Sequence, residues 1–133
     1  MNRVFIDTVG FLALWNGRDQ WNERATAAFT QLMLDGADFC TSAPIILECG
    51  NAAVRFPFRA DLIEVREQFQ ADEKLIVPTE IDELTAWAAY ARGEAANAGI
   101  VDHLSFAIMR RLGIRDAFTN DRHFRAAGFK TLF

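Results

Sequence analysis

Histidine and cysteine are scarce in this sequence, which contains two of each among its 133 residues. Cys40 and Cys49 form no CxxC pair, and only His103 and His123 accompany them. A structural zinc site needs four nitrogen or sulfur ligands at characteristic spacings, and this arrangement is missing. The two cysteines are therefore expected to be buried, reduced thiols.

Long apolar runs are absent as well. No stretch approaches the roughly 18 apolar residues of a membrane-spanning helix, and the three apolar residues after Arg3 are too few for a signal-peptide core. Proline and glycine are sparse, and neither a repeat nor a low-complexity tract is visible. With 51% apolar residues, we expect one soluble, cytoplasmic domain over residues 1–133 with no membrane partner.

Basic residues are outnumbered, with 14 Lys and Arg against 18 Asp and Glu. The excess of acid is confined to residues 1–99, which hold 8 basic and 15 acidic side chains. Residues 100–133 reverse the balance with 6 basic and 3 acidic side chains, so phosphate contacts are expected there if the partner is a nucleic acid. The candidates are Arg110, Arg111, Arg115, Arg122, Arg125 and Lys130, with Arg122 and Arg125 as the possible RNA contacts, and an ordinary solvated surface is the alternative.

Short apolar segments alternate with stretches of helical periodicity along the whole chain. Strands are predicted at about 3–7, 38–41, 74–77, 114–119 and 128–132. Helices are predicted at about 8–15, 20–34, 42–54, 59–71, 79–97, 101–112 and 121–126. Strands that are separated by helices form right-handed crossovers, so the fold class is α/β, with a mostly parallel sheet of four to five strands between helical layers.

Hydroxyl side chains mark the starts of several of these helices. Thr8 is expected to cap the first, and Ser42 the third, with Pro44 in its first turn. Thr79 with Asp82 is typical of a capping box that opens a long helix reaching about Asn97.

Four acidic residues stand where an element begins, ends or faces inward. Asp7 ends the first strand, Asp121 follows the fourth, Asp102 begins a helix, and Glu48 lies among apolar neighbours on the third helix. In a parallel sheet the strand ends and the following helix starts share one edge, so we expect these carboxylates to converge there. Each alone is more often a helix cap or a solvated acid.

Clustered carboxylates repel one another unless a cation neutralises them. Two unit charges about 4 Å apart cost roughly 4 kcal/mol in a partly buried site. Oxygen ligands without sulfur favour a hard ion such as Mg²⁺ or Mn²⁺, which can polarise a phosphodiester and activate water. The hydroxyls of Thr8, Ser105 and Thr119 are candidates for orienting that water or a phosphate oxygen, with capping as the alternative.

Four segments together resemble the PIN domain family, and in length and layout the VapC-type toxins of bacterial toxin–antitoxin systems. They are Val4-Phe5-Ile6-Asp7-Thr8, Glu48 with Asn51 one turn later, Val101-Asp102-His103-Leu104-Ser105-Phe106, and Thr119-Asn120-Asp121-Arg122-His123-Phe124 followed by Gly128-Phe129. Each motif alone is weak. Their order and intervals extend over nearly the whole chain.

This resemblance implies a three-layer α/β/α sandwich and a metal-dependent endoribonuclease. Asp7, Glu48, Asp102 and Asp121 would hold one or two Mg²⁺ or Mn²⁺ ions, with Asn51 as a supporting polar residue. A homodimer is also implied, together with a cognate VapB-type antitoxin whose C-terminal segment occupies the active-site groove and whose N-terminal part binds operator DNA.

Two positions depart from the family pattern. Val9 stands where Ser or Asn often follows Asp-Thr, which removes one polar contact near the metal. His103 stands where a small residue often follows the helix-initial Asp, so it is either an RNA contact, a proton carrier or a packing residue.

Other interpretations of the same residues are possible. A haloacid-dehalogenase-like phosphatase needs a second Asp two residues after the first, where this chain has Val9. A receiver domain needs a late Lys in its site, and Lys130 lies in the terminal segment. An inactive PIN-like module that binds RNA or protein is the serious alternative, although such modules usually lack one of the four acids. The Phe56-Pro57-Phe58 break is expected either to close the core or to contact a partner.

Overall fold

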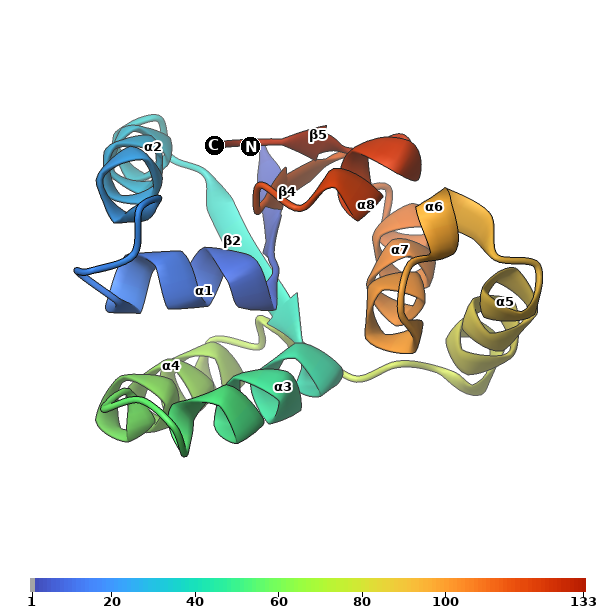
Figure 1. Cartoon of the computed structure of the whole chain (residues 1–133), viewed down its shortest axis with the longest axis horizontal. Coiled ribbons are helices and arrows are strands. Elements are labelled where there is room, and N and C mark those ends of the chain that lie inside the picture. Colours follow the sequence, from blue (N-terminus) through green and yellow to red (C-terminus); the bar gives the residue numbers. More distant parts are fainter. Residues whose placement is uncertain (1) are drawn as a thin grey trace.

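A five-stranded parallel sheet runs through the computed structural model, which describes residues 2–133 (Figure 1). The strand order is β3-β2-β1-β4-β5, and every neighbouring pair is parallel. The strands are β1 (Arg3–Ile6), β2 (Asp38–Ser42), β3 (Leu75–Ile76), β4 (Asp116–Phe118) and β5 (Lys130–Thr131). The predicted sheet of four to five mostly parallel strands is therefore confirmed.

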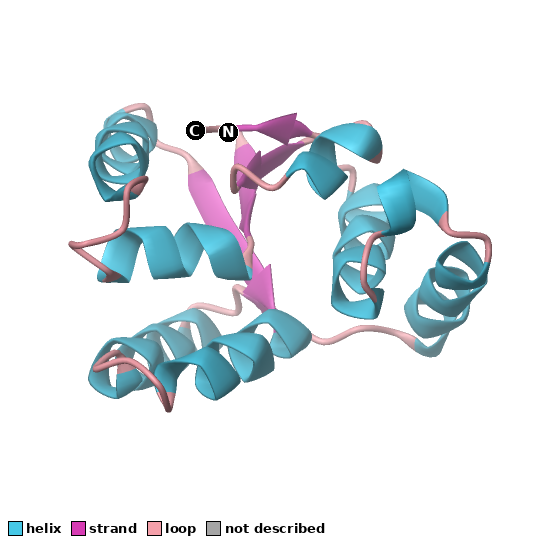
Figure 2. Cartoon of the chain, in the orientation of Figure 1, coloured by secondary structure: helices cyan, strands magenta, loops and turns pink. Residues whose placement is uncertain are grey.

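Helices cover both sides of this sheet, and Figure 2 separates the two kinds of element by colour. The helices are α1 (Thr8–Trp15), α2 (Asn22–Leu34), α3 (Ala43–Ala53), α4 (Arg59–Ala71), α5 (Glu80–Ala91), α6 (Glu94–Asn97), α7 (Ile100–Leu112) and α8 (Arg122–Ala126). In Figure 1, α1 to α4 lie to the left of the sheet and below it, and α5 to α8 lie to the right. None of the helices in residues 2–133 has the length and apolar character needed to cross a membrane.

The central strand β1 is buried over three of its four residues. Val4, Phe5 and Ile6 are at most 1% exposed, because β2 and β4 flank the strand and helices cover both faces. The Thr41 hydroxyl donates to the Ile6 carbonyl at 2.7 Å, and the Asp7 amide donates to the Phe118 carbonyl at 3.4 Å. These bonds hold the end of β1 in place and thereby set the position of Asp7.

Side-chain caps begin two helices as the sequence predicts. Ser42 accepts from the Ile45 amide, and Thr79 and Asp82 form the reciprocal capping box of α5. The first helix differs, because Thr8 is its first helical residue and Asp7 occupies the cap position without a side-chain cap bond. The prediction that Thr8 caps this helix is wrong, and the Asp7 carboxylate is left available for other contacts.

The prediction of one long helix that reaches about Asn97 is also wrong. Helix α5 ends at Ala91, and Gly93 adopts a left-handed conformation with φ of +66°. The short α6 follows, with Ala95 and Ala96 also left-handed. Apolar periodicity continues through this alanine-rich stretch, but Gly93 permits the backbone reversal that brings α7 back against α5.

An ion pair between buried Asp82 and exposed Arg111 joins α5 to α7. Arg111 donates to both carboxylate oxygens of Asp82, with the shortest contact of 2.8 Å at Nη2. Asp82 is 3% exposed, and its bonds with Arg111 lower its pKa. Breaking such a pair leaves an uncompensated buried charge, so Arg111 has a structural role.

The remaining core contacts settle two expectations from the sequence. Cys40 and Cys49 are buried free thiols, as predicted. The Phe56-Pro57-Phe58 turn is divided, because Phe58 is buried beside Trp15 with ring centroids 6.4 Å apart, whereas Phe56 is 47% exposed. Only one of the two aromatic side chains therefore closes the core.

Candidate active site

Asp7 is the deepest of the four predicted site residues. Its side chain follows β1 at the carboxyl edge of the sheet and is 2% exposed. Burial is the main reason that its pKa is raised to about 7, and the negative charge of Asp102 contributes further. The Thr119 hydroxyl donates to Asp7 Oδ2 at 3.0 Å, which favours the ionised form but does not offset the burial.

Asp102 lies in the first turn of α7 and is partly buried. Its pKa is raised to about 6, first by burial and then by the charges of Asp121 and Glu48. Together with the effect of Asp102 and Asp121 on Asp7, this repulsion links all four predicted acids into one electrostatic cluster. The four acids are thus near enough to influence one another's charge, and their sharing of one metal ion stays a prediction.

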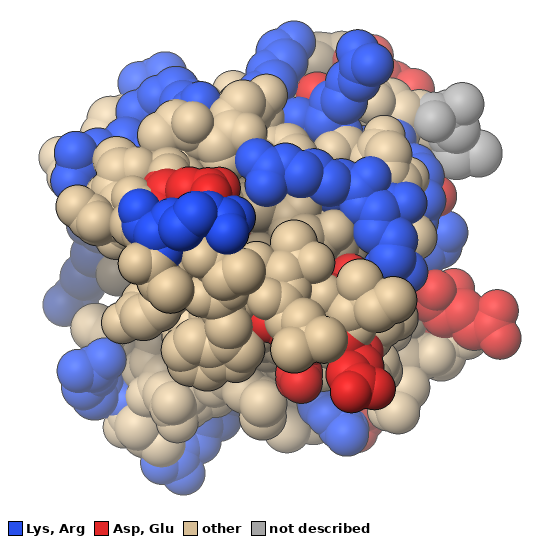
Figure 3. Space-filling view, turned by 90° about the vertical axis from the view of Figure 1, so that its right-hand side faces the viewer, with Lys and Arg blue, Asp and Glu red and all other residues tan. Residues whose placement is uncertain are grey.

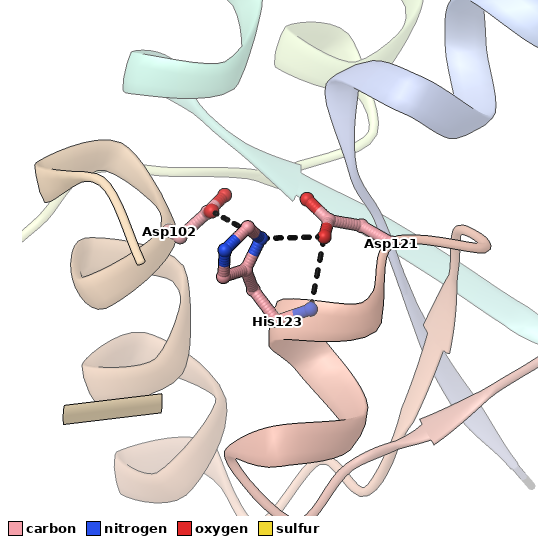
Figure 4. Close-up of side chains that lie close together, drawn as sticks. All are labelled: Asp102, Asp121 and His123. Atoms are coloured by element: carbon pink, nitrogen blue, oxygen red, sulfur yellow. Dashed lines mark hydrogen bonds and ion pairs between the residues drawn. The ribbon is translucent and has the colours of Figure 1, made fainter. Parts of the chain in front are cut away.

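Asp121 holds a histidine against this cluster. Its Oδ1 accepts from the His123 amide at 2.9 Å and lies 2.8 Å from His123 Nδ1 (Figure 4). The same Nδ1 is 4.0 Å from Asp102 Oδ2. Ligand atoms of Asp102, Asp121 and His123 all lie within 4.8 Å of one another, which is close enough for a shared metal ion.

His123 is the site residue that sequence reasoning missed. It was visible in the Asp-Arg-His-Phe motif two residues after Asp121, but the motif alone does not say where the imidazole points. The structure supplies this direction. The Asp121 carboxylate caps the N-terminus of α8 and also hydrogen-bonds to the His123 ring, so the imidazole points back toward Asp121.

Glu48 reaches the cluster from α3. The Thr8 hydroxyl donates to Glu48 Oε1 at 2.6 Å and connects α1 with α3 beside Asp7. Asn51, one turn further along α3, is exposed. Thr8 therefore orients Glu48, and the structure gives Asn51 no corresponding contact with an acid among residues 2–133.

Thr119 bridges two of the acids. Besides donating to Asp7, its Oγ1 accepts from the Asp121 amide at 3.1 Å. This hydroxyl is fully buried, so it positions the carboxylates and is not free to orient a water or a phosphate oxygen. Ser105 is likewise engaged elsewhere, because its hydroxyl donates to the Val101 carbonyl one turn back in α7 at 3.1 Å. The orienting role expected of these two hydroxyls is corrected accordingly.

His103 does not face the site. It is 3% exposed and makes edge contacts with the rings of Tyr90 and Phe106, at centroid distances of 6.5 and 5.5 Å. Burial lowers its pKa, and its Nε2 has no hydrogen-bond partner within residues 2–133. The expectation of an RNA contact is therefore wrong, and packing is the role the structure supports.

Arg122 and Arg125 lie on α8 next to the acids, and both are exposed. The Arg125 Nη1 donates to the Asn120 carbonyl at 3.3 Å, which holds this side chain beside the loop that carries Asp121. Their position fits the predicted contacts with phosphates.

Comparison with known proteins gives a consistent assignment. A model of the PIN domain family matches residues 4–130. The solved structure of VapC20 from Mycobacterium tuberculosis, a toxin that cleaves the sarcin–ricin loop, superposes with a TM-score of 0.77 and 25% sequence identity over 95% of each chain. No curated protein sequence matches significantly.

Two further solved structures share the fold. FitAcB from Neisseria gonorrhoeae has a TM-score of 0.68 and 16% identity, covering 98% of this chain and 96% of its own. FitAB bound to the IR36 DNA fragment has a TM-score of 0.69 and 19% identity, covering 96% of this chain and 92% of its own.

Proposed function

The chain belongs to the PIN domain family, and we propose that it is a metal-dependent endoribonuclease of the VapC toxin type. The observation that carries this proposal is the cluster of four carboxylates around buried Asp7. Their repulsion and burial raise the pKa of Asp7 to about 7 and that of Asp102 to about 6. A site built at this cost in stability suits a bound divalent cation.

The donor set fits Mg²⁺ or Mn²⁺. Asp7, Glu48, Asp102 and Asp121 would hold the ion, since they offer carboxylate oxygens. The Cys49 thiol lies near Asp7 and Glu48, but burial raises its pKa, so it stays protonated and is a poor metal ligand. When bound, such an ion polarises a phosphodiester and lowers the pKa of a bound water. The nearby imidazole of His123 adds a nitrogen donor that Mn²⁺ accepts more readily than Mg²⁺ does.

The chain's own hydrogen bonds prepare these acids for binding. Thr119 holds Asp7 and the backbone of Asp121 together, Thr8 holds Glu48, and His123 orients Asp121. Removing partners that orient metal ligands typically weakens metal affinity roughly 10- to 100-fold. We therefore include Thr119, Thr8 and His123 in the proposed site as residues that position the acids.

RNA is the proposed substrate, with Arg122 and Arg125 as phosphate contacts beside the acids. VapC20, which resembles this chain over nearly its whole length, cleaves an RNA loop, and this supports the assignment. The cognate partner is proposed to be a VapB-type antitoxin that occupies the acidic site in the cytoplasm, and the active form is proposed to be a homodimer. An inactive RNA-binding module is the second candidate.

A cleavage assay decides between these functions. Purified protein should cut RNA with Mg²⁺ or Mn²⁺ and stop when a chelator is added. Asp121→Asn should reduce cleavage by a factor of about 100 or more, as expected when a metal ligand is lost. The matched control is Asp61→Asn, which changes an exposed acid on α4. Equal activity in chelator would refute metal catalysis, and binding without any cleavage would support the inactive module.

A further inference from the structure

A surface cavity of about 580 Å³ lies at the opposite edge of the sheet from the acids. The acids follow the carboxyl ends of β1 and β4, whereas this cavity is lined by the residues that lead into β4 and β5. Three basic side chains surround it, Arg110, Arg115 and Lys130, together with the single acid Asp116. The cavity therefore favours an anionic ligand.

Arg110 is held in place at this cavity. Its Nη2 donates to the Ala127 carbonyl at 2.8 Å, and its guanidinium lies 5.3 Å from the centroid of the Phe129 ring. These contacts use one of its five N–H donors and the face of the group, so donors remain for a ligand. Neither Arg115 nor Lys130 forms an ion pair with any acid in residues 2–133.

The one acid of the lining already has a hydrogen-bond partner. Asp116 Oδ2 accepts from the side-chain amide of Asn2 at 2.7 Å, and Asp116 is partly buried. Arg111, which follows Arg110 in the sequence, does not line the cavity and is paired with Asp82 instead. Three cations and one hydrogen-bonded carboxylate thus set the charge of the cavity.

Arg125 connects this cavity to the acids. Its Nη1 donates both to the carbonyl of Asn120, which precedes Asp121, and to the hydroxyl of Thr131, which follows Lys130. Basic side chains therefore extend from α8 across β5 to the cavity. Figure 3 shows Lys and Arg gathered over the upper part of the face that carries α5 to α8.

We propose that this cavity binds backbone phosphates of the RNA at a distance of several nucleotides from the bond that is cut. The inference rests on the proposed function, because it assumes that the acids define the point of cleavage. Thr119 stands three residues after Asp116, or about 10 Å along β4 at roughly 3.3 Å per residue. Because Ala117 and Phe118 are fully buried, RNA has to pass around the sheet, which is a longer path. A polyanion long enough to cross this distance can reach the cavity and the acids together, which a single nucleotide cannot.

Binding in chelator tests the cavity separately from cleavage. The affinities of wild type and of the double variant Arg115→Glu with Lys130→Glu should be measured for single-stranded RNAs of about 4 and about 16 nucleotides. The double variant should bind the longer RNA at least about 10-fold more weakly, and its salt dependence should be flatter by about 1 to 2 in the log–log slope. For the shorter RNA, which is less able to reach the cavity and the acids together, the double variant should lose less affinity.

The matched control is Arg59→Glu with Arg66→Glu, the same charge change at two exposed residues of α4. An equal loss in the control, or no loss in the cavity variant, would overturn the proposal. So would an equal loss of affinity for polyglutamate or inorganic phosphate, since the cavity would then be a general anion site. Wild type that binds long RNA through the cavity but never cleaves with Mg²⁺ would refute the nuclease function and leave the cavity assignment standing.

Discussion

At the scale of single residues, Asp7 carries the largest electrostatic cost in the site. Its carboxyl is 2% exposed and is approached by the charges of Asp102 and Asp121. The unfolded chain releases the Asp7 proton near the ordinary pKa of 3.8, whereas the folded chain releases it near a pKa of about 7. Because the folded state binds this proton more tightly, the free energy of unfolding falls as pH rises between these two values.

Asp7→Asn should therefore stabilise the metal-free protein while abolishing cleavage. The amide carries no charge to desolvate, so we expect the free energy of unfolding at pH 8 to rise by about 2 to 4 kcal/mol, and to change little at pH 4. Urea unfolding in chelator at both pH values measures this. Asp61→Asn, at an exposed position, should show no such gain. An equal change in the free energy of unfolding at both pH values would mean that the gain does not come from removing the Asp7 charge.

Thr119→Val should weaken the site without emptying it of acids. The variant keeps the side-chain shape but removes the donor to Asp7 and the acceptor of the Asp121 amide. We expect metal affinity, measured by titration calorimetry, to fall by about 10- to 100-fold. Thr30→Val, at an exposed position on α2, is the control. A change of metal affinity no larger than in the control would mean that this hydroxyl does not position the acids.

At the scale of elements, α1 and β4 approach each other at Gly10. A Cβ at this position would collide with the carbonyl oxygen and ring of Phe118. Gly10→Ala should therefore lower the free energy of unfolding by about 1 to 3 kcal/mol, because the core has to shift to admit a methyl group. Gly17→Ala is the control, since a methyl group added there would meet no atom within 4 Å. Thermal melts of both variants measure the difference, and equal melting temperatures would contradict the close contact.

The elements that could be predicted are those with local signals. The β-branched and aromatic run of β1 and the capping residues of α3 and α5 identify their own structures. The convergence of the acids followed from a general property of parallel sheets. The left-handed turn at Gly93 was missed because alanine periodicity runs through it, and the Asp82–Arg111 pair was missed because its partners lie 29 residues apart.

The direction in which a side chain points was the other feature that the sequence could not predict. His103 and His123 look alike in sequence, since each stands within two residues of a site Asp. The structure buries the first between Tyr90 and Phe106 and turns the second toward Asp102 and Asp121. Which way each ring points depends on packing between helices distant in sequence, and periodicity does not report that.

At the scale of the whole molecule, charge is divided between the two edges of one sheet. Acids gather where β1 and β4 end, and basic side chains gather where β4 and β5 begin. The net charge of −4 hides this division. Under the proposed function the two edges would have complementary tasks, because a cation held by the acids would act on one phosphate while the basic edge would hold others.

A divalent cation should consequently stabilise the entire fold, since it binds the folded chain and relieves the repulsion among its acids. We expect the melting temperature at pH 8 to rise with Mg²⁺ or Mn²⁺ and to return with chelator, with a gain of about 2.7 kcal/mol when the ion is at roughly 100 times its Kd. The gain should shrink at pH 5, where protons compete for Asp7 and Asp102, whose pKa values are about 7 and about 6. Asp102→Asn should lose most of the gain and Asp61→Asn should keep it. The same rise in both variants would place the stabilising ion outside the acidic cluster.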